Sequence, residues 1–376
     1  MNGRISSSDI AKMLNKKAGR NIAHTLEAEN PTEVKEWIPT GSRYLDSIIC
    51  RGKLAGIPVG KIIEIAGLSS SGKSYMGAQI AANAQKMGIK VIYFDSENAQ
   101  DPAFLENSGC DITSENGVIY LQAQWVEQVL EMIESCLATG AKFLFIWDSL
   151  ANTPAKADVE GDYNPQSSMA VRPRVLSKGL AKLVQPIGDS KSTFLILNQL
   201  KTKISSNVWE AKLDPYFTPG GMAAIYNYSL RIWLTRSKAS KSFVLDDKGF
   251  RVGTLVKAKI QKSRYGTEGR TCNFQIIWGD QEKIGILDEE SWLDAIKPSE
   301  HLTNSGAWFK LDGYEKKFTG SQFAHLVRTD DNFKQIVLDI MDEEVIRKFD
   351  KREVSASNFY DADEEREEIN NEKSNV

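Results

Sequence analysis

An α/β fold built around a mostly parallel sheet is predicted for this chain of 376 residues. Two observations predict it. Between residues 61 and 197, short apolar runs alternate with segments whose apolar residues recur every three or four positions, as buried parallel strands alternate with covering helices. After about residue 229 strand-like runs follow one another directly, which indicates an antiparallel extension of the sheet.

The N-terminal segment, residues 1–34, is expected to form a separate helix. The apolar residues over 7–28 share helical spacing and are Ile10, Met13, Leu14 and Ile22. Asn30-Pro31 then breaks the pattern. An apolar stripe outside the main body needs a partner to cover it, either the chain's own core or a neighbouring subunit.

The core domain is predicted over residues 35–284. Its parallel strands are expected at 61–65, 91–94, 118–121, 143–147 and 193–197, and its helices at 74–87, 101–107, 126–137 and 169–184. Gly88 and Gly140 follow two of these helices, a position that glycine favours. Antiparallel strands are expected at 229–234, 242–245, 253–260 and 271–277, with a turn at 246–249.

Residues 285–352 are expected to form a small α+β domain. Helical patterns lie at 291–296, 322–327, 333–341 and 344–349, with a hairpin over 308–318. The remaining segment, 353–376, is acidic and polar, which is typical of disorder.

The bulk composition excludes several classes of protein. No apolar run approaches the roughly 20 residues that span a bilayer, and no signal peptide is recognisable, so a cytoplasmic protein without membrane contact is expected. The four cysteines form no close pair, which argues against a zinc site or a disulfide framework. The net charge is −3, but residues 361–376 hold seven acids and two bases, so the rest of the chain is slightly basic. Charge therefore neither demands nor excludes a nucleic-acid partner.

The strongest motif is Gly67-Leu68-Ser69-Ser70-Ser71-Gly72-Lys73-Ser74, which matches the P-loop pattern at every fixed position. It follows an expected strand and opens an expected helix, the context that the pattern requires. The loop would cradle the phosphates of ATP, Lys73 would reach the β- and γ-phosphates, and the Ser74 hydroxyl would bind Mg²⁺. The alternative is a chance turn rich in glycine and serine.

Acidic and amide side chains follow three other expected strands. Asp148 ends an apolar strand and is the natural acid for the Mg²⁺ site. Glu97 follows another strand and could activate water, although Asp95 or Glu97 could instead cap the next helix. Gln199 ends a further strand, where its amide could contact the γ-phosphate or could be an ordinary loop side chain.

Two long loops follow strands at the same edge of the sheet, at 151–168 and 201–221. Loops of this length in a compact domain are usually functional. The second contains Lys201, Lys203 and Ile204, and cations mixed with apolar side chains suit single-stranded nucleic acid. The alternative is a lid over a small-molecule site.

A group of cations falls in one expected strand-turn-strand: Lys257, Lys259, Lys262, Arg264 and Arg270. A solvated strand face is the simpler interpretation. The other is a set of cations that reach phosphates across a subunit boundary, as an arginine finger does.

Several motifs together make the chain resemble the bacterial RecA recombinases from about residue 35 to 350. They are Pro39-Thr40-Gly41-Ser42, Leu45-Asp46, Gly60–Ile65 leading into the P-loop, Phe94–Pro102, Asp148–Ala151, Asn198-Gln199, Gly220-Gly221 and Gly306-Ala307-Trp308. The resemblance implies a RecA-like P-loop ATPase core, an N-terminal oligomerisation segment, ATP and Mg²⁺ as ligands, and single- and double-stranded DNA as partners.

The resemblance also assigns roles residue by residue. It makes Glu97 the catalytic acid, Asp148 the metal-side acid and Gln199 the sensor of the γ-phosphate. Asp101 and Phe104 fall where the family grips adenine, with phenylalanine in place of the usual tyrosine. The DNA-binding set comprises Met169, Arg174, Lys201, Lys203, Ile204, Gly220 and Gly221. Lys262 and Arg264 fall where two lysines of a neighbouring subunit reach the nucleotide, the second being arginine here.

Other features depart from cellular RecA. The second loop contains Trp209, Pro215 and Phe217, and the segment Gln261–Arg264 with the acidic tail looks more like the UvsX-type recombinases of large bacteriophages. The resemblance therefore implies a recombinase that forms helical filaments on single-stranded DNA and catalyses homologous pairing and strand exchange. A bacteriophage is one candidate source. Mediator and single-strand-binding proteins are further candidate partners. The alternatives are a hexameric helicase of the same superfold and an ATP-gated DNA scaffold.

Overall fold

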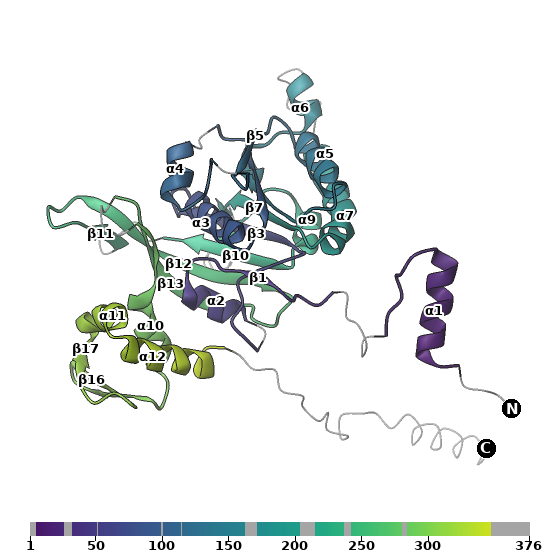
Figure 1. The fold of residues 1–376 in the computed structure, drawn as a ribbon. Coiled ribbons are helices and arrows are strands. Elements are labelled where there is room, and N and C mark those ends of the chain that lie inside the picture. Colours follow the sequence, from purple (N-terminus) through teal and green to yellow (C-terminus); the bar gives the residue numbers. More distant parts are fainter. Residues whose placement is uncertain are drawn as a thin grey trace, which may run out of the picture.

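A computed structural model describes residues 5–25, 32–50, 52–98, 101–113, 115–161, 171–203, 215–236, 242–279 and 284–346. Its centre is a ten-stranded sheet with the order β14-β13-β12-β10-β3-β7-β6-β4-β5, to which β11 adds beside β12 (Figure 1). The parallel strands are β3 (Ile62–Gly67), β4 (Lys90–Asp95), β5 (Ile119–Gln122), β6 (Phe143–Asp148), β7 (Thr193–Gln199) and β10 (Leu230–Thr235). The predicted α/β fold is confirmed.

The antiparallel strands extend one side of this sheet. They are β11 (Phe243–Leu245), β12 (Arg251–Ser263), β13 (Thr271–Ile277) and β14 (Gly285–Leu287). The predicted strand at 229–234 corresponds to β10, which pairs antiparallel with β12, as expected, but parallel with β3. The prediction of a purely antiparallel strand was therefore wrong. Pairing continues through β14, so the large sheet runs past residue 284.

Helices cover both faces of the sheet, so that two apolar cores form. On one face, α2 (Arg43–Ile49), α3 (Lys73–Lys86) and α4 (Pro102–Asn107) pack against the sheet. On the other face, α5 (Val126–Leu137), α7 (Val171–Asp189) and α9 (Met222–Asn227) bury apolar side chains against the same strands. Along the residues that the structure describes, no helix combines the length and apolar character needed to cross a membrane.

The N-terminal helix is shorter than predicted. Helix α1 (Ser7–Ala18) ends at Gly19, which adopts the left-handed conformation of a C-cap (φ +66°). The chain then folds back, because Asn15 Oδ1 accepts hydrogen bonds from the backbone N–H groups of Ile22 and Ala23, both at 2.7 Å. The prediction was therefore wrong for residues 19–25, and residues 26–28 lie outside the described ranges. No residue of α1 is buried, and Figure 1 shows it apart from the sheet.

A short β-ribbon connects this segment to the core. It pairs β1 (Trp37–Ile38) with β2 (Ile57–Pro58), and α2 lies between them in the chain. The sequence missed all three elements. Helix α2 has a clear start, since the Ser42 side chain accepts a hydrogen bond from Leu45 N, but only seven residues follow.

The C-terminal unit combines helices with a small sheet. Helices α10 (Glu289–Ile296), α11 (Gly320–Thr329) and α12 (Asp331–Glu344) pack around β15 (Leu302–Ser305), β16 (Trp308–Leu311) and β17 (Phe318–Thr319). The predicted hairpin is therefore part of a three-stranded sheet. Aromatic rings of Phe318, Phe323 and Phe333 meet in its core, with centroids 5.1–5.8 Å apart. The predicted helix at 344–349 was wrong at Val345 and Ile346, and its later residues lie outside the described ranges.

Candidate nucleotide-binding site

The P-loop joins β3 to α3 in a turn that only small side chains permit. A Cβ atom on Gly67 would lie 2.2 Å from Ser71 Oγ, and one on Gly72 would lie 2.1 Å from Ile276 Cδ1. Gly72 also has φ +86° and Ser70 φ +55°, both in the left-handed region. The glycine spacing of the motif thus follows from steric contacts with the loop itself and with β13.

The N-terminus of α3 is open for an anion. Its N-cap is Gly72, so no side chain caps the first-turn N–H groups. The Ser71 hydroxyl is buried and has no hydrogen-bond partner among the described residues. Lys73 Nζ makes one long hydrogen bond, 3.4 Å to Leu68 O. The uncapped helix N-terminus, the Ser71 hydroxyl and the weakly bonded Lys73 ammonium fit the phosphates of a nucleotide.

Burial lowers the pKa of Lys73, and the Asp148 and Glu97 carboxylates raise it again. Burial likewise raises the pKa of Asp148, and hydrogen bonds from Ser74 and Tyr93 oppose that shift. The Tyr93 hydroxyl donates to Asp148 Oδ2 at 2.7 Å. A buried carboxylate beside the Ser74 hydroxyl is a donor set that suits Mg²⁺, and a cation there would favour the charged form of Asp148.

Glu97 lies at the meeting point of three strand ends. Its Oε1 accepts hydrogen bonds from Ser149 Oγ (2.6 Å), Asn152 Nδ2 (2.8 Å) and Gln199 Nε2 (3.4 Å). The other oxygen, Oε2, accepts none from the residues that the structure describes. Glu97 is therefore fixed through one oxygen, and its second oxygen is available to a water molecule.

The helix-capping alternative for Asp95 and Glu97 was wrong. The cap of α4 is Asp101, whose side chain accepts from Ala103 N. Asp95 instead accepts from Glu97 N (2.8 Å) and from the Tyr120 hydroxyl (2.8 Å), so it shapes the turn that presents Glu97.

Phe104 lies close to the P-loop helix. Its ring meets that of Tyr75 edge to face, with centroids 5.9 Å apart, and Tyr75 directly follows Ser74 in the chain. Helices α3 and α4 are neighbours in Figure 1. Phe104 thus lies beside the helix that the P-loop opens, and Asp101 caps the helix that carries Phe104.

The end of the second predicted loop lies beside the start of the first. A Cβ on Gly220 would lie 3.4 Å from Leu150 Cδ2, and one on Gly221 would lie 3.5 Å from Pro173 Cβ. Arg172 Nη2 donates a hydrogen bond to Leu150 O. The glycine pair of the second loop therefore packs against the start of the first loop and the start of α7.

Both loops contain regular structure that the sequence did not indicate. The first begins with a 3-10 turn, η1 (Leu150–Asn152), and continues with α6 (Lys156–Glu160). The second begins and ends with paired strands, β8 (Lys201–Thr202) and β9 (Tyr216–Phe217). Lys201 and Arg174 are exposed, Lys203 is half-buried, and Met169 and Ile204 lie outside the described residues.

Lys262 and Arg264 lie away from the P-loop of their own chain. In the sheet, Lys262 pairs with Arg231, whereas the P-loop residue Gly67 is level with Leu234, about 10 Å further along. Lys262 Nζ donates to Ile225 O (2.7 Å), and Arg264 Nη2 donates to Tyr226 O (3.0 Å). Neither cation belongs to the phosphate site of the same chain.

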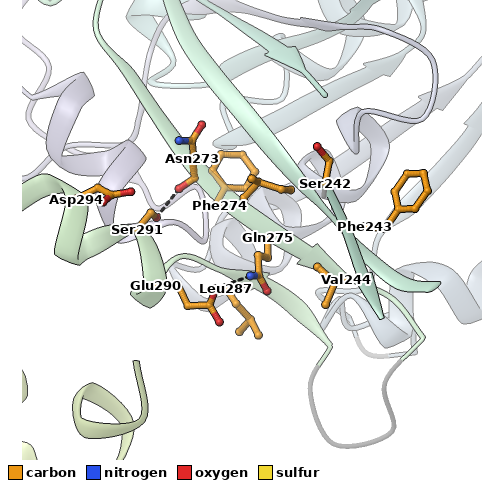
Figure 2. A pocket seen from close by; sticks show the side chains of 11 residues that line it. Ser242, Phe243, Val244, Asn273, Phe274, Gln275, Leu287, Glu290, Ser291 and Asp294 are labelled. Carbon is orange, nitrogen blue, oxygen red and sulfur yellow. Dashed lines mark hydrogen bonds between the residues drawn. The ribbon is translucent and has the colours of Figure 1, made fainter. Parts of the chain in front are cut away.

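A different hollow, of about 320 Å³, lies between β13 and α10 (Figure 2). Gln275 Nε2 donates to Glu290 Oε2 across it at 2.6 Å, and the Ser291 hydroxyl donates to Asn273 O. None of its lining residues belongs to the P-loop or carries one of the predicted catalytic groups. This hollow is separate from the phosphate site.

The fold and the site together define a P-loop nucleotide-binding protein with an acid beside the phosphate edge. Residues 6–283 match the RecA N-terminal domain family. The chain is 33% identical over 306 residues to protein RecA of Ruminococcus albus, covering 81% of this chain and 69% of that protein. It is 31% identical over 285 residues to protein RecA of Streptomyces avermitilis, covering 76% and 70%. The chain belongs to the RecA family of recombinases, so the resemblance read from the sequence is confirmed.

Proposed function

We propose that this protein is a DNA-dependent ATPase that polymerises on single-stranded DNA and catalyses homologous pairing and strand exchange. One observation supports the link between ATP and DNA most directly. Glu97 Oε1 is hydrogen-bonded to Asn152, in the first turn of one predicted DNA loop, and to Gln199, which lies two residues before the other. A change at the γ-phosphate would therefore reach both loops through one carboxylate.

In the proposed chemistry, Glu97 Oε2 accepts a proton from the attacking water while Oε1 stays held by Ser149 and Asn152. Lys73 and the N-terminus of α3 hold the β- and γ-phosphates. Ser74 and Asp148 hold Mg²⁺, which when bound supplies positive charge that stabilises the phosphate oxygens. Asp101 and Phe104 contact the adenine.

The proposed DNA contacts are independent of sequence. Arg174, Lys201 and Lys203 neutralise backbone phosphates, and Met169 and Ile204 separate the bases. Gly220 and Gly221 let the second loop return close to the first. The register of pairing then comes from base pairing between strands, rather than from protein contacts to base edges.

The filament is proposed to complete the catalytic site. Because Lys262 and Arg264 lie away from their own P-loop, they can act on phosphates only in another copy of the chain. A head-to-tail contact of this kind generates an open helix. The uncovered apolar face of α1 supports the same assembly, since a neighbouring core would bury Ile10 and Leu14.

Three finer assignments belong to the same proposal. The action on DNA would take place in the cytoplasm of a bacterial cell. Mediator and single-strand-binding proteins would assist loading. Phage encoding is supported only by the segment Gln261–Arg264 and the acidic C-terminus.

ATP turnover measured with and without single-stranded DNA tests this proposal against an ATP-gated scaffold. We expect single-stranded DNA to stimulate ATP hydrolysis. An ATP turnover rate that is the same with and without DNA would contradict the proposal. Electron microscopy with an ATP analogue and single-stranded DNA separates the recombinase from a hexameric helicase. Extended helical filaments are expected, whereas closed rings alone would exclude the recombinase.

A further inference from the structure

A buried ion pair lies on the face of the sheet opposite α3 and joins β10 to β3, the strand that leads into the P-loop. Arg231 Nε donates to Glu64 Oε2 at 2.6 Å, and the two side chains are 7% and 1% exposed. The residues are direct neighbours across β10 and β3. The guanidinium also lies 5.9 Å from the ring centroids of both Tyr228 and Trp233, which fix its position. Burying two charges is unfavourable unless each is fully partnered, so the geometry here is tightly constrained.

Asn198 ties this ion pair to the sensor residue. Its Nδ2 donates to Glu64 Oε1 at 2.8 Å, and its Oδ1 accepts from the backbone N–H of Gln199 at 2.9 Å. Asn198 is completely buried. The backbone of Gln199 is thus held in place, while its side chain makes only a long contact, 3.4 Å, with Glu97. A rigid backbone beneath a loosely held amide suits a side chain that responds to a phosphate.

The same network holds the returning end of the second loop. Asn198 Nδ2 donates also to Pro219 O at 2.9 Å, and Arg231 Nη2 donates to Thr218 Oγ1 at 2.9 Å. Thr218 and Pro219 directly precede the glycine pair that packs on the first loop. Both N–H groups of the Asn198 amide are therefore used, one on the ion pair and one on the loop.

We propose that Glu64, Asn198, Arg231 and Thr218 are positioning residues that couple the nucleotide state of Gln199 to the returning end of the second loop. Asn198 touches both backbones, so a displacement at Gln199 changes the hydrogen bond to Pro219. The ion pair keeps Asn198 from rotating away, since a rotated amide would leave Glu64 Oε1 buried without a partner. This inference rests on the proposed function and specifies how its two ligands communicate.

Thr218→Val tests the coupling with little change in side-chain shape, because it replaces by a methyl group the hydroxyl that accepts the hydrogen bond from Arg231 Nη2. The measured quantity is the ratio of the Kd values for a fluorescent oligo(dT), without and with a slowly hydrolysed ATP analogue. We expect the variant to lower this ratio at least five-fold relative to the wild-type chain. Thr218→Ser, which keeps the hydroxyl, should restore it.

Thr254→Val is the matched control, since Thr254 is also a buried threonine whose hydroxyl is hydrogen-bonded, to Ser242 O at 3.2 Å. It should keep the wild-type ratio. If the ATP analogue changes the Kd of the wild-type chain for oligo(dT), a Kd ratio for Thr218→Val within two-fold of the wild-type ratio would overturn the coupling but not the proposed function. If the analogue leaves the Kd of the wild-type chain unchanged, the proposed function would be overturned as well.

Hydrogen exchange on the unaltered protein gives a test that needs no variant. Addition of the ATP analogue without DNA should slow exchange in peptides that contain Gln199 and in those that cover 215–221, at similar nucleotide concentrations. Protection around Gln199 with no change at 215–221 would show that the two ends are independent and would refute the coupling.

Discussion

Replacing Glu97 by Gln separates the chemistry of the site from its architecture. The wild-type carboxylate uses Oε1 for three hydrogen bonds, from Ser149, Asn152 and Gln199. A glutamine in the same rotamer keeps an oxygen there and places its NH₂ group where Oε2 was. The local contacts are therefore retained, while the group that would accept the proton from water is replaced by a donor.

The expected loss follows from the role of a positioned base. General base catalysis contributes about 10²- to 10⁴-fold, so kcat for ATP should fall by that factor, equivalent to about 3–5 kcal/mol in the barrier. The Kd for ATP should change by less than about three-fold, because no phosphate ligand is lost. Filaments should persist longer, since the ATP-bound state is hydrolysed slowly.

The assay is phosphate release at saturating ATP and single-stranded DNA, alongside equilibrium binding of a fluorescent ATP analogue. Glu131→Gln, on the exposed side of α5, is the matched control and should behave as wild type. An unchanged kcat in Glu97→Gln would refute the assignment of the base. A large loss of nucleotide affinity would instead show that the carboxylate has a structural role.

Three further outcomes are expected. Lys73→Ala removes the cation between Asp148 and Glu97 and should reduce nucleotide affinity about 10- to 100-fold, so ATP turnover at the wild-type rate would exclude this phosphate site. Burial raises the pKa of Asp46 to about 7, so the folded chain binds a proton more tightly than the unfolded one; stability should fall as pH rises from about 4 to 7 and then level off. Relative to Asp46→Asn, urea unfolding of the wild type should show a loss of about 4 kcal/mol across that window, and parallel pH profiles would contradict the shift. Deleting 355–376 removes seven acids and should strengthen duplex DNA binding most at low salt, whereas identical salt titrations would dismiss any screening by that segment.

The phosphate site could be predicted because the residues that form the P-loop are contiguous in the sequence. The closest contacts of a Cβ on Gly67 lie within the motif, at Ser71 and Lys73, and two contacts reach distant strands: Gly67 with Leu234 O and Gly72 with Ile276. The convergence of Asp148, Glu97 and Gln199 followed from the rule that parallel strands end at one edge. Their assigned roles came from the resemblance to RecA, since the sequence spacing alone did not decide whether Glu97 activates water or caps a helix.

The features that the sequence missed depend on distant partners or on short elements. Ser149 and Asn152 reach Glu97 because η1 turns the chain after β6, and no periodic pattern marks a three-residue turn. The parallel pairing of β10 depends on the path from β7 to β10. Glu64 and Arg231 did leave a signal, a single charge within each of two apolar strands, but only the sheet register shows that they are neighbours.

Strand exchange between homologous DNA substrates, with ATP and Mg²⁺, is the decisive assay for a recombinase. We expect the wild-type chain to produce exchanged duplex and Lys73→Ala to produce none. A wild-type chain that binds single-stranded DNA and hydrolyses ATP, yet yields no exchanged product, would rule out the recombinase and favour a motor of the same superfold.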